Sequence, residues 1–209
     1  MIDVKAFTLG DLATNCYLLE ETISGEMAVV DPATDEIIDI LKSLNCDFSK
    51  IKYIFLTHAH FDHIYGTAPL KELTNAEIVI SRVEKPSLGD NDINLSSSFL
   101  PPKGMEEIVP DMLVDDGSII KLGNTDIKIM LTPGHTAGSI CLLFEDNLIS
   151  GDTLFCESVG RTDLPTGDMN MLLKSLGKIK AIDGNCRVYP GHGRPTTLDH
   201  ERKYNIYMD

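Results

Sequence analysis

The sequence predicts an α/β fold, because segments with strand-like and helix-like hydrophobic patterns alternate along its 209 residues. A strand, helix, strand unit spans residues 51–81, and a histidine-rich turn follows its first strand. Hydrophobic residues make up 43% and charged residues 24% of the chain, which is typical of a soluble globular protein. We find no repeat of obvious period and no Pro/Ser/Gly-rich linker, so residues 1–209 are expected to form a single domain.

The first 45 residues are expected to form strands followed by a helix. Apolar, strand-like runs occupy residues 4–9, 16–21 and 25–31. The Ser24-Gly25 pair favours a hairpin turn between the second and third runs. The period then changes, and a helix over 33–45 would place four apolar side chains on one face: Ile37, Ile40, Leu41 and Leu44.

The central unit begins with an almost wholly apolar strand, residues 51–57, of the kind that is buried on both faces. It runs directly into the histidine-rich turn, and a helix over 64–73 and a strand over 76–81 follow. Open sheets flanked by helices tend to place their functional sites at the carboxyl ends of strands. The turn after residue 57 is therefore the expected position of a site.

The remaining elements follow from turn signals and periodicity. Residues 84–111 are the least regular part and are expected to form a long loop or lid. Two hairpins are predicted, one over 118–132 around Gly123-Asn124 and one over 139–152 around Asp146-Asn147. A helix over 169–180, a strand over 186–190 and a final helix from about Thr197 complete the prediction.

Charge and hydropathy exclude several classes of partner. The 32 acidic against 18 basic residues give a net charge of -14, which disfavours binding to nucleic acid. The longest apolar runs are far shorter than the roughly 20 residues of a membrane helix. The beginning of the chain, with Asp3, does not resemble a secretory signal, so we expect a cytoplasmic protein without a membrane partner. Five scattered cysteines without a C-x-x-C pair fit reduced thiols.

Residues 57–63, THAHFDH, contain three of the six histidines. His58 and His60 are two positions apart, so in an extended segment their rings point to the same side. Asp62 and His63 follow in the turn and can face a neighbouring position. Neutral imidazole and carboxylate are ligands that suit borderline divalent metals, so the stretch predicts a metal site.

Three further ligands are expected just after predicted strands, in glycine-bearing turns: His135 in TPGHT, Asp152 in SGDTL and His192 in YPGHG. A single loop histidine is more often a surface or core residue than a ligand. Here five of the six histidines fall at strand ends, which favours a metal site. One tetrahedral ion cannot use all seven groups, whereas two ions about 3.5 to 4 Å apart can share them.

These residues carry a family resemblance. The pattern H-x-H-x-D-H at 58–63, followed by His135, Asp152 and His192 in that order, resembles the metallo-beta-lactamase superfamily over nearly the whole chain. The resemblance implies a four-layer αββα sandwich, in which two mixed sheets pack face to face with helices outside. It also implies that the first metal is held by His58, His60 and His135, the second by Asp62, His63 and His192, and that Asp152 bridges them.

The residue at 152 distinguishes branches of this superfamily. The best-known beta-lactamases carry a cysteine around that position, whereas an aspartate resembles glyoxalase II and related hydrolases, so antibiotic hydrolysis is not the first expectation. Residues 158–168 and 196–205 resemble small bacterial glyoxalase II-like proteins. Full-length glyoxalase II has a helical glutathione-binding domain after the last ligand, but only 17 residues follow His192 here, so glutathione recognition is not carried over.

The resemblance implies a dinuclear, metal-dependent hydrolase with two divalent ions, Zn²⁺ first and Fe or Mn as alternatives. A water whose pKa the metals lower to about 7 would attack a small thioester, ester or lactone. Asp62 is expected to orient that water or carry its proton, and Asp31 to orient an imidazole. Arg161 is expected either to contact an anionic thioester substrate or to pair with Asp163. The alternatives are a persulfide dioxygenase-like oxidoreductase with one iron and a metal-bearing binding module.

Overall fold

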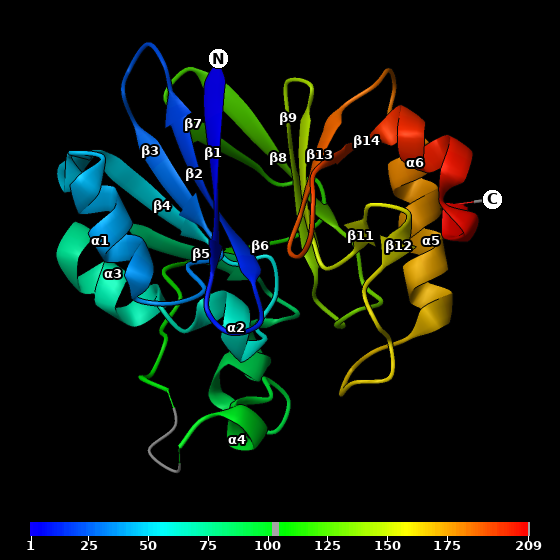
Figure 1. Ribbon diagram of the computed structural model, residues 1–209, viewed down its shortest axis with the longest axis horizontal. Coiled ribbons are helices and arrows are strands. Elements are labelled where there is room, and N and C mark those ends of the chain that lie inside the picture. Colours follow the sequence, from blue (N-terminus) through cyan, green and yellow to red (C-terminus); the bar gives the residue numbers. More distant parts are fainter. Residues whose placement is uncertain (102–104, 209) are drawn as a thin grey trace.

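Two six-stranded sheets pack face to face, with helices on both outer faces (Figure 1), in the computed structural model, which describes residues 1–101 and 105–208. The first sheet has the order β1-β2-β3-β4-β5-β6 and the second β14-β13-β10-β9-β8-β7. Helices α1 and α3 cover the first sheet, and α5 and α6 cover the second. The predicted four-layer sandwich is therefore confirmed.

The first sheet is antiparallel at its start and parallel thereafter. Its strands are β1 (Ile2–Leu9), β2 (Thr14–Glu21), β3 (Met27–Val30), β4 (Ile51–Phe55), β5 (Glu77–Ser81) and β6 (Met112–Val114). The first three pair as antiparallel neighbours, and β3 to β6 pair in parallel. Parallel pairing requires crossover connections: α1 lies in the first, α3 in the second, and the third, between β5 and β6, is the long segment over 82–111.

The second sheet is built mainly from hairpins. Its strands are β7 (Ile119–Leu122), β8 (Thr125–Leu131), β9 (Ile140–Phe144), β10 (Asn147–Gly151), β13 (Arg187–Pro190) and β14 (Thr196–Thr197). Only β10 and β13 pair in parallel, across the crossover that contains α5. A small hairpin of β11 (Leu154–Phe155) and β12 (Ser158–Val159) lies between β10 and α5 in the chain.

Six α-helices and three 3₁₀ segments lie within the described residues. The α-helices are α1 (Glu36–Ser43), α2 (Phe61–Ile64), α3 (Thr67–Thr74), α4 (Ser96–Phe99), α5 (Met169–Lys180) and α6 (Leu198–Tyr204). The 3₁₀ segments are η1 (Phe48–Lys50), η2 (Lys85–Gly89) and η3 (Ile206–Met208). The hydroxyl of Thr197 caps α6 by accepting from the amide of His200, so this helix begins where the sequence predicts it.

Three apolar clusters join these layers. The central cluster lies between the sheets and includes Tyr17, Phe55 and Leu142, each no more than 1% exposed. A second cluster packs α1 and α3 against the first sheet, and a third packs α5 and α6 against the second. Both sheets are thus buried on two faces, which explains the near-continuous apolar runs in the sequence.

The helix predicted over 64–73 is two helices, α2 and α3, that are broken at Gly66. The amide of Gly66 donates to the carbonyl of Pro32 at 2.7 Å. A Cβ at this position would lie 2.3 Å from the carbonyl oxygen of Thr34, so only glycine permits this close approach. The helix predicted over 33–45 is also shorter, because α1 begins at Glu36 and leaves Leu44 44% exposed.

The predicted hairpins are present, with one shift of register. The turns at Ser24-Gly25 and Gly123-Asn124 connect antiparallel strands as expected. In the third hairpin Phe144 pairs with Asn147, so the turn residues are Glu145 and Asp146, one position before the prediction. The expected loop over 84–111 contains η2 and α4 and is otherwise largely irregular, and its residues 102–104 lie outside the described part.

The carboxyl ends of β4, β8, β10 and β13 meet at one edge of the sandwich, and the turns that follow them carry the predicted ligands. Within residues 1–101 and 105–208, no helix is both long enough and apolar enough to cross a membrane.

Candidate metal centre

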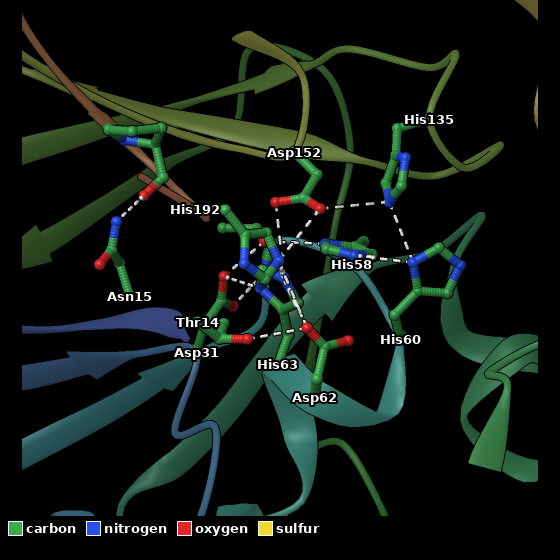
Figure 2. A network of polar contacts seen from close by, with 12 residues as sticks. Thr14, Asn15, Asp31, His58, His60, Asp62, His63, His135, Asp152 and His192 are labelled. Atoms are coloured by element: carbon green, nitrogen blue, oxygen red, sulfur yellow. Dashed lines mark hydrogen bonds and ion pairs between the residues drawn. The ribbon is translucent and has the colours of Figure 1, made fainter. Parts of the chain in front are cut away.

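All seven predicted ligand side chains meet at this edge, although they come from four separate turns (Figure 2). Their nitrogen and oxygen atoms form overlapping groups in which the ligand atoms lie within 4.8 Å of one another. One group contains His58, His60 and His135, and another contains Asp62, His63 and His192. These are the two sets that the family resemblance implies.

The first set is formed by three imidazole nitrogens. Nε2 of His58 lies 3.1 Å from Nδ1 of His60, and Nε2 of His135 lies 2.9 Å from the same atom. All three side chains are buried, and the rings are nearly perpendicular to one another. Three nitrogens that converge in this way form one face of a tetrahedral or octahedral metal site.

The second set combines two imidazoles and one carboxylate. Oδ2 of Asp62 lies 3.3 Å from Nε2 of His192 and 3.6 Å from Nε2 of His63. The two Nε2 atoms are 3.3 Å apart. His63 is fully buried, whereas the His192 side chain is 28% exposed, so the second set is the one that opens to solvent.

Asp152 lies between the two sets. Its Oδ1 is 3.5 Å from Nε2 of His63, and its Oδ2 is 3.5 Å both from Nε2 of His135 and from Nε2 of His192. One carboxylate therefore reaches nitrogens of both sets, which is the arrangement needed to bridge two ions.

Outer hydrogen bonds determine the tautomers of four imidazoles. Nδ1 of His63 donates to Oδ2 of Asp31 at 2.8 Å, and Nδ1 of His192 donates to the carbonyl of Leu12 at 3.2 Å. Nδ1 of His135 donates to the carbonyl of Arg161 at 2.7 Å.

The fourth tautomer, that of His58, follows from the Thr57 hydroxyl. This hydroxyl gives its proton to Asp31 at 2.6 Å and therefore accepts from Nδ1 of His58 at 3.1 Å. In their neutral forms with these tautomers, all four Nε2 atoms present lone pairs to the centre, although without metal His63 carries a second proton, on Nε2, because the neighbouring carboxylates raise its pKa. The inward-facing imidazole nitrogens lie 2.9 to 3.3 Å apart. At such distances, lone pairs that face one another repel unless a cation lies between them.

Two buried polar atoms of the centre have no hydrogen-bond partner among the described residues: Nε2 of His60 and Oδ1 of Asp152. Buried polar groups are almost always paired, so an unpartnered carboxylate oxygen indicates that something else satisfies it. Together with the inward lone pairs, this oxygen shows that the donor set fits divalent cations.

The pKa values divide the centre into two regions. Burial lowers the pKa of His60 to about 3 and lowers the pKa of His58 and of His135, so the first set is neutral at pH 7. Burial acts in the same direction on His63, but Asp152, Asp62 and Asp31 outweigh it and raise its pKa to about 10. Neutral imidazoles are ready to bind a metal, and the proton on His63 shows how strongly the carboxylates attract positive charge.

Asp62 is ionised in the same field. Burial alone would raise the pKa of its carboxyl, but His63, His192 and the hydroxyl of Thr14 together lower it. Burial alone would lower the pKa of His192, but its hydrogen bond to Asp62 and the charges of Asp152 and Asp62 together outweigh burial and raise it.

Gly191 permits the close packing of this centre. A Cβ at position 191 would lie 2.0 Å from Oδ1 of Asp152 and 2.7 Å from Cε1 of His63. The backbone of Gly191 also pairs with the other sheet, because its carbonyl accepts from the amide of Asn15 at 2.7 Å. The turn before His192 can therefore contain only glycine at this position without displacing ligands.

The structure decides between the two expectations for Arg161 only in part. Its guanidinium binds both carboxylate oxygens of Asp163, at 2.6 and 2.7 Å, and both side chains are largely exposed. Pairing with Asp163 is the second of the two expectations for Arg161, and contact between Arg161 and a substrate stays a prediction. The carbonyl of Arg161 orients His135, a role that no sequence signal indicates. The expected role of Asp31 in orienting an imidazole is confirmed by its contact with His63.

Three further residues support the centre and were not predicted. Thr14 donates its hydroxyl to Oδ2 of Asp62 at 2.8 Å. Glu84 is buried and accepts from the amides of Ala59 at 3.1 Å and Gly138 at 2.8 Å, so it joins the loops that carry the first set. Thr57, within the histidine motif itself, links His58 to Asp31. Of the three, only Thr57 has a position that could have indicated its role, because it directly precedes His58 in the histidine motif.

Comparison with known proteins identifies relatives along most of the chain. The model of the metallo-beta-lactamase superfamily matches residues 9–192. A probable metallo-hydrolase of Methanocaldococcus jannaschii is 36% identical over 191 residues, 87% of this chain and 88% of that protein. A probable polyketide biosynthesis zinc-dependent hydrolase of Bacillus subtilis is 32% identical over 198 residues, 92% of this chain and 80% of that protein.

Two solved structures are similar over nearly their whole length. The BLEG-1 B3 metallo-beta-lactamase superposes with a TM-score of 0.90 at 32% identity, covering 99% of both chains. The protein TTHA1623, solved in a di-iron-bound form, superposes with a TM-score of 0.85 at 30% identity, covering 98% of this chain and 100% of that one.

Proposed function

This chain belongs to the metallo-beta-lactamase superfamily, and from that membership we propose that it is a dinuclear metal-dependent hydrolase that cleaves a small ester or thioester. The observation that carries the proposal is the inward orientation of four imidazole Nε2 atoms around Asp152. One ion would be held by His58, His60 and His135 and a second by Asp62, His63 and His192, with Asp152 shared between them. Two divalent cations supply Lewis acidity and lower the pKa of water to about 7.

Asp62 is the group that we assign to the proton of the attacking water. Thr14 and His192 both contact its Oδ2, and its Oδ1 makes neither of these contacts. The lowered pKa keeps the carboxylate ionised, so Oδ1 can accept a hydrogen bond from water and orient it. Thr14 restrains the carboxylate through its hydroxyl, and Asp31 keeps the acceptor nitrogen of His63 directed inward.

Zinc is our first assignment for the metal, and two of the similar proteins bear on it. Imidazole and carboxylate donors suit zinc, and the Bacillus subtilis relative is named a zinc-dependent hydrolase. The same donors accept iron, and the name of TTHA1623 records a di-iron form. Seven converging groups exceed what one ion requires, which supports two ions, and the metal content distinguishes this hydrolase from a mononuclear iron oxidoreductase of the persulfide dioxygenase kind.

Beta-lactam hydrolysis is the second candidate, because BLEG-1 is named a B3 metallo-beta-lactamase and superposes closely. A glyoxalase II-like activity remains the finer proposal from the loop at 158–168 and from Asp152. A small ester, S-lactoylglutathione and a chromogenic cephalosporin therefore form a panel that separates three activities of the same centre.

The test measures hydrolysis of this panel by protein loaded with zinc, together with the metal content. We expect about two zinc ions per chain and ester or thioester cleavage that Asp152→Asn reduces at least a hundredfold, since one shared ligand oxygen is lost. His200→Gln is the matched control, because His200 is the one histidine outside the centre. One iron per chain with oxygen consumption on glutathione persulfide would instead establish the oxidoreductase.

A further inference from the structure

We propose that the natural substrate carries an apolar group with no negative charge, which binds in a cavity beside the second metal set. This inference rests on the proposed function, because it concerns the substrate of the same centre. It differs from the anionic thioester substrate that we expect from the sequence, because the wall of the cavity is apolar and acidic.

The cavity has a volume of about 410 Å³ and reaches the centre through Asp62 and Thr14. Thr14 donates to Asp62, so a group in this cavity lies next to the carboxylate that we assign to the attacking water. Its walls come from the β1–β2 loop, the start of α1, α2 and the end of α4. A volume of this size accommodates a short acyl chain or a small ring.

Exposed apolar side chains gather around this cavity. Leu12, Tyr65 and Phe99 line it and are 44%, 43% and 58% exposed. The ring of Phe99 stacks on that of Phe61, with centroids 4.9 Å apart and an interplanar angle of 18°. Clustered exposed apolar residues at the mouth of a site indicate contact with an apolar ligand.

The charges in the wall are all negative. Asp11, Asp35 and Glu36 line the cavity, and none of them forms an ion pair with a described residue. No lysine or arginine among the described residues lines it. The wall therefore presents three carboxylates that have no cationic partner within residues 1–101 and 105–208.

Three arginines of the second half of the chain lie at other places. Arg161 is paired with Asp163, and Arg187 and Arg194 line a separate hollow of about 430 Å³ that contains none of the seven ligands. A negatively charged group in the cavity would thus meet repulsion from three carboxylates, with no lysine or arginine among the described wall residues to offset it, and only the two metal ions proposed at the centre would act in the opposite direction. Three carboxylates within a Debye length, about 10 Å at 0.1 M salt, are expected to disfavour an anion about tenfold.

The experiment compares p-nitrophenyl hexanoate with mono-p-nitrophenyl adipate, which has the same chain length and a terminal carboxylate. Both are hydrolysed by zinc-loaded protein, and kcat/KM is measured at low salt. We expect hexanoate to be preferred and the preference to fall about tenfold in the variant Asp11→Asn, Asp35→Asn, Glu36→Gln. The control variant Glu72→Gln, Glu77→Gln, Asp183→Asn removes the same charge elsewhere and should leave the preference unchanged.

A second readout does not depend on turnover. Nile red, a neutral apolar dye, should bind the zinc-loaded protein at least fivefold more weakly in Phe99→Ser than in the wild type. Ile119→Ser removes an equally exposed apolar side chain from β7 and should bind the dye as the wild type does.

The outcomes separate the two proposals. Adipate cleaved as well as hexanoate, or a preference that both triple variants change equally, would overturn the inference while the hydrolase stands. Equal dye binding by the two serine variants would also count against it. If neither the esters nor the thioester of the panel is cleaved, the proposed function fails, and the dye result then decides whether the cavity binds apolar groups.

Discussion

Replacing Asp31 by asparagine tests how far the outer hydrogen bonds control the metal centre. Asp31 is 1% exposed and accepts from the amide of Thr57 at 2.7 Å, from the Thr57 hydroxyl at 2.6 Å and from Nδ1 of His63 at 2.8 Å. Its backbone has a φ of 50°, which asparagine tolerates well, so the substitution changes the side-chain chemistry and not the turn.

The amide of the variant has only one acceptor oxygen. If that oxygen keeps the backbone amide of Thr57, the NH₂ group faces the hydroxyl of Thr57 and Nδ1 of His63. His63 must then accept at Nδ1 and carry its proton on Nε2, the atom that faces the second metal. Loss of such an outer partner costs about 10- to 100-fold in metal affinity, or about 1.4 to 2.8 kcal/mol.

Competition with a chromophoric chelator measures the affinity for each zinc ion. We expect the ion beside His63 to bind 10- to 100-fold more weakly in Asp31→Asn, and the ion beside His58 to weaken as well, because the Thr57 hydroxyl loses the acceptor through which it orients His58. Asp183→Asn, at an exposed position outside the centre, is the control. If Asp31→Asn binds both ions within twofold of the wild type, the tautomer of His63 is not controlled as we describe.

Three more predictions follow from the same contacts. Glu84→Ala leaves two loop amides without their acceptor, so the free energy of unfolding should fall by about 1 to 3 kcal/mol in denaturant titrations; unchanged stability would contradict this role. Gly191→Ala should lower zinc affinity more than tenfold because its Cβ would displace two ligands, whereas Gly177→Ala, which meets open space in α5, should bind zinc normally. Since His63 has a pKa of about 10 without metal, zinc binding at pH 7 should release about one proton from it, measurable by calorimetry in buffers of different ionisation enthalpy; no release would show that this imidazole is already neutral.

Much of the fold was predictable because periodicity and turn residues are local signals. Most strands of both sheets and the hairpin turns at Gly25 and Gly123 follow from short stretches of sequence, whereas the short edge strands β6 and β14 were not predicted. The break between α2 and α3 could not be predicted. It depends on the close contact between Gly66 and the carbonyl of Pro32, which lies 34 positions earlier in the chain. The packing of the two sheets against each other depends on contacts between residues that are distant in sequence, and only the family resemblance predicted it.

The candidate centre shows the same division. The seven ligand positions could be predicted because histidine and aspartate at strand ends are rare and chemically distinctive. The carbonyls of Leu12 and Arg161, which orient His192 and His135, could not, since any residue type supplies a carbonyl. The acidic wall of the cavity was equally hidden, because Asp11 lies in the β1–β2 loop and Glu36 at the start of α1, and neither belongs to a motif.

The central claim is that two ions share this one cage of side chains, and anomalous diffraction from crystals of the zinc-loaded protein tests it most directly. We predict two peaks about 3.5 to 4 Å apart. One should lie about 2.0 to 2.1 Å from nitrogens of His58, His60 and His135, and the other beside His63 and His192. A single peak, no peak, or zinc bound instead at the exposed group of Cys156, Glu157 and His200 would contradict the account.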